Sequence, residues 1–415
     1  MGIHKKKLAV LVAAMGCGAA HAEVVVYGMA MPFLENAKTT GATNGVPTDR
    51  PNMVAASAYT GLNDASRSRI TVGTSHLGFR GSEELGGGLK AVFQLESGFQ
   101  IDQNAGAGLG ARDSKIGLRH EAWGEIFLGQ WDTPYKYIAL PTNPIRGGYD
   151  FDRNTLIGNP GLLVPGTTTQ FTRVPGKPDA AFDRRQGNSI QYWSPNWAGF
   201  TFRLQYSANE GKGAVVTGGP VLNPEVMGGS IQWDRGQLSL RYAYDRHRDY
   251  FGMTQIGGSA AGTLTNTGSK DEGHKFVLLW LIGNTRITGT YEQLRYHNDD
   301  STAGAVKDYK RNAYYAVLEQ RFFNGLQSIF GAYGRAEDGN CGRVGGLACS
   351  THAMGASFWN VGYIYRFSKR TEGFLYYYKV DNKESGTYAP SVLIGTTVAP
   401  GADSEGYGVG LQHFF

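Results

Sequence analysis

No segment of this 415-residue chain offers the roughly twenty consecutive apolar residues that a transmembrane helix needs. This absence excludes a helical membrane protein. Cysteine is scarce, with three residues in all, and the formal net charge is only +5. A charge this small favours neither a nucleic acid nor an acidic protein as partner. No cofactor motif stands out, and we expect neither a cofactor nor a metal.

The first 22 residues have the composition of a secretory signal peptide. Three consecutive lysines, Lys5 to Lys7, form a positive region, residues 8–20 are almost wholly apolar or small, and Ala20-His21-Ala22 is typical of a cleavage site. Cys17 suggests a lipoprotein as the alternative, but the residues before it match a lipobox poorly. We expect residues 1–22 to be removed and residues 23–415 to form one exported domain, whose net charge falls to +2 without the leader lysines.

The exported domain retains two cysteines, Cys341 and Cys349, in a stretch rich in Gly and Ser. In an oxidising periplasm, such a close pair is predicted to form a disulfide that closes a short loop. Two free thiols are the alternative. Together with the nearby His352, the two cysteines fall short of a closed zinc site.

Apolar and polar residues alternate along several long segments. In residues 200–207, four apolar residues alternate with a polar set that includes Arg203, and in residues 238–245 the polar set includes Arg241. This period of two predicts strands with one apolar and one polar face. Long strands with two such faces suit a wall between lipid and water.

The links between the predicted strands alternate in length. Short links such as Gly283-Asn284 and Asn324-Gly325 have tight-turn chemistry, whereas long links such as 34–66 and 250–272 are rich in small and polar residues. Short periplasmic turns and long extracellular loops are typical of outer-membrane barrels, in which an even strand number places both ends in the periplasm. We predict an all-β fold, a transmembrane antiparallel β-barrel of sixteen strands near 23–33, 67–81, 88–103, 111–120, 124–131, 186–194, 198–208, 225–234, 236–249, 273–282, 285–298, 310–322, 326–337, 353–367, 373–385 and 404–415.

Aromatic residues flank four of the short links: Trp193 and Trp197, Trp233, Phe322 and Phe323, and Phe367 and Phe374. Rings in these positions predict an interfacial girdle beside the periplasmic turns, with ordinary core aromatics as the alternative. The last strand alternates and ends on Phe415, which resembles the signal read by the barrel-insertion machinery during assembly.

Several segments resemble the general porins of β-proteobacteria. These segments are the run Ser75 to Ala91 (SHLGFRGSEELGGGLKA), residues 115–118 with 124–129, residues 188–192 with Ser194-Pro195, residues 363–371 and residues 408–415. The resemblance runs over essentially the whole mature chain. It implies a homotrimer of sixteen-stranded barrels among the lipid and lipopolysaccharide of a Gram-negative outer membrane. Each barrel would carry a pore for small hydrophilic solutes and ions.

In that family the third external loop folds inward and narrows the pore, and the resemblance assigns this role to residues 131–185. A link of this length without secondary structure of its own needs a functional reason, which a constriction provides. Charged side chains that face one another at the narrowest point set selectivity in such pores. The candidates are His76, Arg80, Arg203 and Arg241 on the wall, and Lys136, Arg146, Asp150, Asp152 and Arg153 in the loop.

Within this loop, the run Asp150-Phe151-Asp152-Arg153 is the candidate for acid at the constriction. Its paired aspartates also suit calcium, but the spacing of an EF-hand is missing. Where the family reads Ser-Arg-Leu-Gly, this chain has His76 at the second position, and Gln130 replaces a common arginine. These departures predict a weaker basic field, pH sensitivity through His76 and a weak-to-moderate anion preference.

These features predict a general-diffusion porin and no enzyme. A barrel hydrolase needs a Ser-His pair at the rim, but no Gly-x-Ser-x-Gly elbow is present, and the glycine-rich run 106–110 lacks a following helix. A substrate-specific channel for an organic anion or a sugar is the alternative. For that channel, Tyr135, Tyr137 and Tyr149 would be the sugar contacts.

Overall fold

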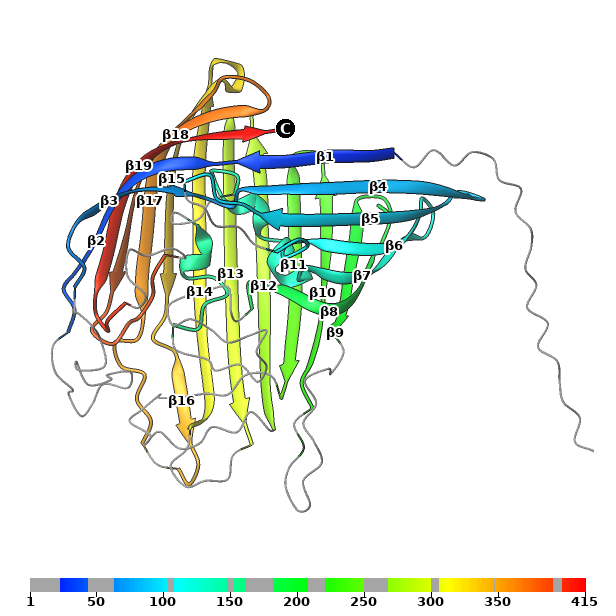
Figure 1. Cartoon of the computed structure of the whole chain (residues 1–415). Helices are drawn as coiled ribbons and strands as arrows, with labels where there is room; N and C mark the ends of the chain where they lie inside the picture. Colours follow the sequence, from blue (N-terminus) through cyan, green and yellow to red (C-terminus); the bar gives the residue numbers. More distant parts are fainter. Residues whose placement is uncertain are drawn as a thin grey trace, which may run out of the picture.

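Strands form nearly all of the regular structure and follow one another around a closed wall in this computed structural model (Figure 1). The structure describes residues 23–43, 63–102, 108–147, 152–161, 182–207, 221, 223–249, 268–299, 306–346, 348–390 and 398–415. The expected signal peptide, Asp150 and Tyr149 lie outside these ranges. None of the helices in the described ranges is long and apolar enough to cross a membrane.

The strands run in chain order around the wall, each antiparallel to its neighbours. Their bounds are β1 Glu23–Ala30, β2 Pro32–Thr40, β3 Arg67–Val72, β4 His76–Gly86, β5 Leu89–Gly98, β6 Ser114–His120, β7 Gly124–Asp132, β8 Arg185–Trp193, β9 Phe200–Ser207, β10 Glu225–Arg235, β11 Leu238–Arg248, β12 Ser269–Ile282, β13 Thr285–Asn298, β14 Val306–Phe322, β15 Gln327–Ala336, β16 Asn340–Arg343, β17 Ala356–Arg366, β18 Thr371–Asn382 and β19 Asp403–Phe414. The short helices are α1 Pro134–Tyr137, η2 Leu140–Thr142, η3 Arg153–Thr155 and η6 Phe323–Gly325.

These nineteen strands build the sixteen-stranded barrel that the alternation predicts. The first predicted strand is β1 and β2 with a break at Met31, the second is β3 and β4, and β16 extends the wall beyond β15. Several boundaries differ from the prediction, and the ends of the first three strands differ most, with the third strand ending at Gly98 and not at residue 103. The first strand continues to Thr40, so the first long loop begins later than residue 34, and the second continues to Gly86.

The barrel closes where the first strand meets the last. β19 pairs with β18 on one side and with β2 and the end of β1 on the other, so blue and red strands lie side by side in Figure 1. Phe415 continues this seam, because its backbone exchanges hydrogen bonds of 3.0 and 3.1 Å with Gly28. Its ring lies over Gly28, where a Cβ atom would come within 2.5 Å of the ring. The C-terminal residue is therefore part of the wall.

The aromatic girdle predicted beside the short turns is only partly correct. Trp197, Phe322, Phe323 and Phe367 are exposed, as a lipid interface requires. Phe374, however, is 3% exposed and packs inside the barrel, and Trp193 contacts the buried rings of the inner wall. Neighbouring residues of a strand point to opposite faces of the sheet. Phe374 and Trp193 occupy positions that face the barrel interior, whereas the exposed rings face outward.

Part of the barrel interior is an apolar core. The inner faces of β14 to β19 and β2 carry buried residues such as Phe330, Phe358 and Tyr378, and Ile145, Leu156 and Ile157 from the link after β7 pack on them. Glycines of β19 make room for the rings of β18. A Cβ atom on Gly410 would overlap the Phe374 ring, and one on Gly408 would come within 2.7 Å of Tyr376.

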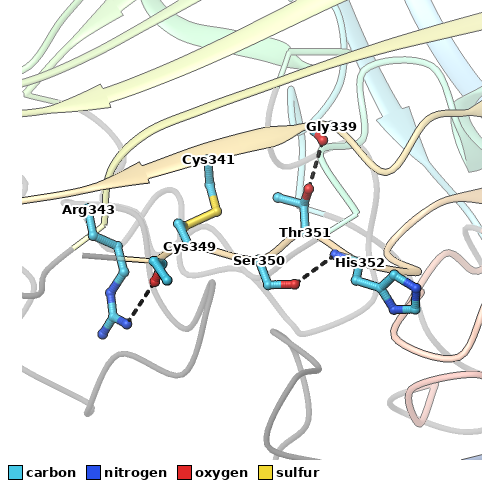
Figure 2. Close-up of a disulfide and its surroundings, with 8 residues drawn as sticks. Gly339, Cys341, Arg343, Cys349, Ser350, Thr351 and His352 are labelled. Atoms are coloured by element: carbon cyan, nitrogen blue, oxygen red, sulfur yellow. Dashed lines mark hydrogen bonds between the residues drawn. A yellow bond between two sulfur atoms is a disulfide. The ribbon is translucent and has the colours of Figure 1, made fainter. Parts of the chain in front are cut away.

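Cys341 and Cys349 form a disulfide in the hairpin after β15 (Figure 2). Their Cα atoms lie 5.7 Å apart, and the two cysteines are eight positions apart in the sequence. Thr351 donates a 2.7 Å hydrogen bond to the carbonyl of Gly339 across the same hairpin. The disulfide therefore joins β16, which pairs with β14, to the segment that leads into β17.

We expect Gly410→Ala to lower the free energy of unfolding by about 1–3 kcal/mol, because the added methyl group overpacks the space that the Phe374 ring fills. Heat denaturation of the folded barrel in detergent, followed by its electrophoretic mobility, measures the change. Gly331→Ala is the matched control, since nothing lies within 4 Å of its Cβ position. Equal melting temperatures for the two variants would contradict this packing.

Candidate functional site in the barrel lumen

The described parts of the link between β7 and β8 lie inside the barrel. Its first helix, α1, begins at Pro134, and Thr133 caps it by accepting a 3.1 Å hydrogen bond from the Lys136 backbone. The carbonyls of Ile138 and Pro141 accept hydrogen bonds of 3.2 Å from Arg241 on β11 and 2.8 Å from Arg286 on β13. We call the described parts of this link, residues 133–147, 152–161 and 182–184, the inner segment.

A buried network of charges attaches the inner segment to β12, β13 and β14. Glu292 lies at its centre and accepts hydrogen bonds from the Tyr135 hydroxyl at 2.8 Å and from the Gly158 backbone at 2.7 Å. Lys275 lies 3.0 Å from Asp183 and 3.6 Å from Glu292, and Arg311 lies 3.1 Å from Glu292. These charged side chains have no exposed surface, so a displaced inner segment would leave charges unpaired in the interior.

Asp152 and Arg153 belong to this network. Arg153 is fully buried and pairs with Asp152 at 3.3 Å and with Asp183 at 3.0 Å, and burial raises the pKa of Asp152. The Asp152 side chain also accepts a hydrogen bond from Asn154 at the start of η3. The burial of Asp152 and Arg153 argues against the constriction role that the sequence suggested for them. Arg153 instead connects parts of the inner segment with one another, since it donates to Asn143 and pairs with Asp183.

Four arginines and two glutamates gather near the short turns, in a group that we call the turn-side cluster: Arg146, Arg286, Arg321, Arg366, Glu319 and Glu372. Glu319 is contacted by Arg286 at 2.7 Å, Arg366 at 3.1 Å and Arg321 at 3.3 Å. Glu372 pairs with Arg146 at 2.6 Å. Both glutamates are almost fully buried, whereas the Arg146 and Arg321 side chains are 57% and 33% exposed.

These residues, together with the prolines of the inner segment, line a cavity of about 460 Å³. Four cations against two carboxylates leave it with an excess of two positive charges. The sequence prediction named only Arg146 of this cluster. The signal for the other arginines was present, because Arg286, Arg321 and Arg366 lie on the polar faces of their strands, but their convergence depends on strand register.

A second group, the loop-side cluster, lies near the long loops on β4 to β8: His76, Glu96, Arg112, Asp113, Asp132, Lys136 and Arg185. Arg185 bridges Asp113 at 2.7 Å and Asp132 at 3.4 Å. Lys136 pairs with Asp132 at 3.1 Å, and His76 Nε2 lies 3.8 Å from Glu96. With His76 neutral, the cluster holds three cations and three carboxylates.

Burial, reinforced by the neighbouring charge of Asp132, raises the pKa of Asp113 to about 6. Asp113 precedes β6, and its carboxylate accepts a hydrogen bond of 3.1 Å from the Asp132 backbone and one of 2.7 Å from Arg185. Other charges of the loop-side cluster, among them Glu96 and Lys136, also act on it. The loop-side cluster therefore becomes more positive as the pH falls through 6.

Arg203 and Arg241 face inward, as the alternation predicts, and they contact the first turn of the inner segment. The Arg203 guanidinium lies 3.6 Å from the centre of the Tyr137 ring and 4.8 Å from that of Trp193. Arg241 donates to Ser239 and to the carbonyl of Ile138. Neither arginine forms a salt bridge within the described residues. Both arginines therefore hold the first turn of the inner segment in place. This role differs from the predicted one, in which they face acidic groups across a pore.

Lys115 occupies an aromatic cage on the inner wall. Its ammonium lies 4.4 to 4.7 Å from the ring centres of Phe127, Trp131 and Trp193, and it pairs with Glu125. Trp193 in turn contacts Tyr137 at 5.6 Å between centroids. Tyr135 is fully buried and Tyr137 packs against this wall, so these two rings are packing contacts. That arrangement disfavours the sugar path considered for them.

Arg80 is exposed on the inner face of β4, with its guanidinium 5.0 Å from the Tyr27 ring centre. The structure therefore distributes the predicted pore residues over several places. Lys136 and His76 join the loop-side cluster, Arg146 joins the turn-side cluster, and Asp150 lies outside the described residues. Within the described ranges no group of three or more His, Cys, Asp and Glu side chains is arranged to hold a metal ion.

We expect Lys275→Met to lower the free energy of unfolding by about 3–5 kcal/mol, because Asp183 and Glu292 lose their shared buried partner. Thermal unfolding in detergent measures this loss. In the control, Lys379→Met removes a surface lysine paired with Asp381, and we expect a change of about 1 kcal/mol or less. A buried variant no less stable than the surface variant would show that the network does not hold the segment.

The sequence of this chain is similar to those of known outer-membrane proteins. A profile of the Gram-negative porin family matches residues 8–385. Outer membrane porin protein 32 of Delftia acidovorans is 27% identical over 367 residues, which are 86% of this chain and 91% of the relative. An outer membrane porin protein of Bordetella pertussis is 25% identical over 366 residues, 82% of each chain.

Among solved structures, an anion-selective porin from Comamonas acidovorans has a TM-score of 0.68 and 20% identity, covering 95% of this chain and 100% of that one. An outer-membrane protein of Vibrio cholerae, OmpT, has a TM-score of 0.59 at 13% identity and 95% coverage of this chain. These similarities show the shared barrel fold. Because the family profile covers most of the sequence, the chain belongs to the Gram-negative porin family.

Proposed function

We propose that this porin forms a water-filled channel for passive diffusion of small hydrophilic solutes and ions, with a weak-to-moderate preference for anions. The turn-side cluster carries this proposal. Its four arginines outnumber its two glutamates, and the glutamates are buried while two arginines reach into the cavity. Rings of charge at a narrow point set the sign of selectivity in channels.

The location and the family support further parts of the proposal. Relatives named outer membrane porins place the barrel in the outer membrane of a Gram-negative bacterium. We propose that lipid and lipopolysaccharide surround it there. We propose that residues 1–22 are removed on export, that residues 131–185 constrict the pore, and that the barrel assembles as a homotrimer. In the same proposal, Phe415 serves as the signal for the insertion machinery.

Single-channel recording in a planar bilayer tests this function. We expect long-lived ohmic steps in groups of three, and under a salt gradient a reversal potential of the sign that anion preference requires. Liposome swelling should follow solute size alone. Folded protein that gives no ohmic steps would contradict general diffusion, and saturable flux of one solute class would indicate a substrate-specific channel.

Removing two cations from the turn-side cluster should weaken the anion preference. We expect the double variant Arg146→Gln with Arg321→Gln to lower the chloride-to-potassium permeability ratio about two- to fivefold, since a unit charge about 8 Å away in water contributes about 0.5 kcal/mol. Reversal potentials measure this ratio. The matched control, Lys38→Gln with Lys379→Gln, removes two cations from the outer face and should leave the ratio unchanged. A ratio unchanged in both double variants would reject the cluster as the selectivity element.

Acidification should strengthen the anion preference. Because the pKa of Asp113 is about 6, its carboxylate gains a proton between pH 7 and pH 5 and the loop-side cluster loses a negative charge. The chloride-to-potassium ratio should therefore rise over this range. Asp113→Asn should show the higher ratio already at pH 7 and little change at pH 5. If this variant keeps the full pH response, another group such as His76 is responsible.

A further inference from the structure

The inner segment exposes an apolar surface to the cavity of the turn-side cluster. Leu140 is 36% exposed, and the neighbouring Pro141 is exposed as well. The other leucine and isoleucine side chains of the described inner segment are at most 1% exposed: Ile138, Ile145, Leu156 and Ile157. Leu140 and Pro141 begin η2 and line the same cavity as the turn-side arginines. One wall of this charged cavity is therefore apolar.

Hydrogen bonds to the backbone and side chain around η2 hold the apolar wall in place. Arg286 donates to the carbonyls of Pro141 at 2.8 Å and Asn143 at 3.3 Å. The Asn143 side chain accepts a further hydrogen bond of 3.0 Å from the buried Arg153. An apolar wall that is already fixed in the free protein binds a matching solute surface with little further loss of conformational freedom.

Two of the four turn-side arginines use their guanidinium groups fully for structure. Arg286 donates from its Nε atom to Glu319 and from both terminal nitrogens to the two carbonyls near η2. Arg366 donates to the carbonyl of Gly325, to the Ser328 hydroxyl and to Glu319. These two arginines build the wall of the cavity and have little capacity left for a solute.

The other two arginines keep free donors. Arg321 donates only from Nε, to Glu319, and Arg146 donates only from one terminal nitrogen, to Glu372. Their remaining N–H groups make no hydrogen bond with the described residues, and both side chains keep exposed surface. A guanidinium group with free N–H groups binds a carboxylate through two parallel hydrogen bonds.

We propose that this cavity binds organic anions of the aromatic monocarboxylate class, with the carboxylate on the free N–H groups of Arg146 and Arg321 and the ring against Leu140 and Pro141. An inorganic anion would use the guanidinium groups but not the apolar wall. A second carboxylate on the solute would lose water against that wall without a partner. The inference rests on the proposed function and deepens it, since uncharged solutes would still pass according to size.

Channel conductance in potassium chloride, titrated with sodium benzoate, tests this site. Bound benzoate fills the cavity and cancels a positive charge there, so the chloride current should fall to a plateau. Acetate is the matched ligand, because it has the same charge and lacks the ring. We expect half-block by benzoate at a concentration about tenfold lower than by acetate, since burial of about 60 Å² of ring surface strengthens binding by about that factor.

Leu140→Asn removes the apolar surface and keeps the charge of the cavity. We expect it to weaken the benzoate block at least fivefold and to change the acetate block less than twofold. Leu109→Asn is the matched control, because it replaces a leucine that is 76% exposed in the link after β5, and it should behave as the wild type. Arg321→Gln should weaken the block by both ligands, since each needs the guanidinium group. Heat-modifiable mobility shows that each variant is folded.

Three results would overturn the inference: equal half-blocking concentrations of benzoate and acetate, an undiminished benzoate block in Leu140→Asn, or a tighter block by inorganic phosphate than by benzoate. Saturation-transfer NMR of benzoate with the folded porin in detergent measures binding without any current. A porin that gives no ohmic steps, but contacts the benzoate ring less after Leu140→Asn, rejects the proposed function alone. An open, anion-preferring channel that benzoate and acetate block equally rejects this inference alone.

Discussion

The attachment of the inner segment to the wall through Glu292 is the interaction on which the interior depends. One carboxylate holds a backbone amide, a tyrosine hydroxyl, a lysine and an arginine, and these partners come from the inner segment, β12 and β14. Buried ion pairs add little net stability, but removing one partner is costly. The network therefore fixes the position of the inner segment more than it raises the stability of the barrel. It holds Tyr135, Gly158 and Asp183 of the inner segment against the wall.

The inner surface is divided between packing and charge. On part of the wall from β14 to β18, apolar residues of the inner segment pack against buried residues of the strands. The charges near the lumen include two clusters, the loop-side cluster, which is balanced at neutral pH, and the turn-side cluster, which is not. A solute that crosses the barrel meets the balanced group before the positive one, when it enters from the long loops.

Basic residues have different roles in this barrel according to their surroundings. Arg153, Arg311 and Lys275 are buried and neutralised, so they contribute structure and no field in the lumen. Lys115 and Arg203 lie against aromatic rings that connect the inner segment to β6 and β9. Only cations that keep exposed surface, such as Arg146 and Arg321 in the cavity, remain to meet a solute.

The sequence by itself determined the strands, their faces and the sorting of short and long links, because a period of two is a local property of each segment. It also predicted that Arg203 and Arg241 lie on the inner face and that the two cysteines, which are close in sequence, form a disulfide. It did not determine which charges meet. Asp152 and Arg153 looked like pore residues but are buried, and Arg286, Arg321 and Arg366 converge on Glu319 from three strands. Such contacts depend on strand register and on the path of the inner segment, which only the tertiary structure decides, since both are set by packing across the closed barrel.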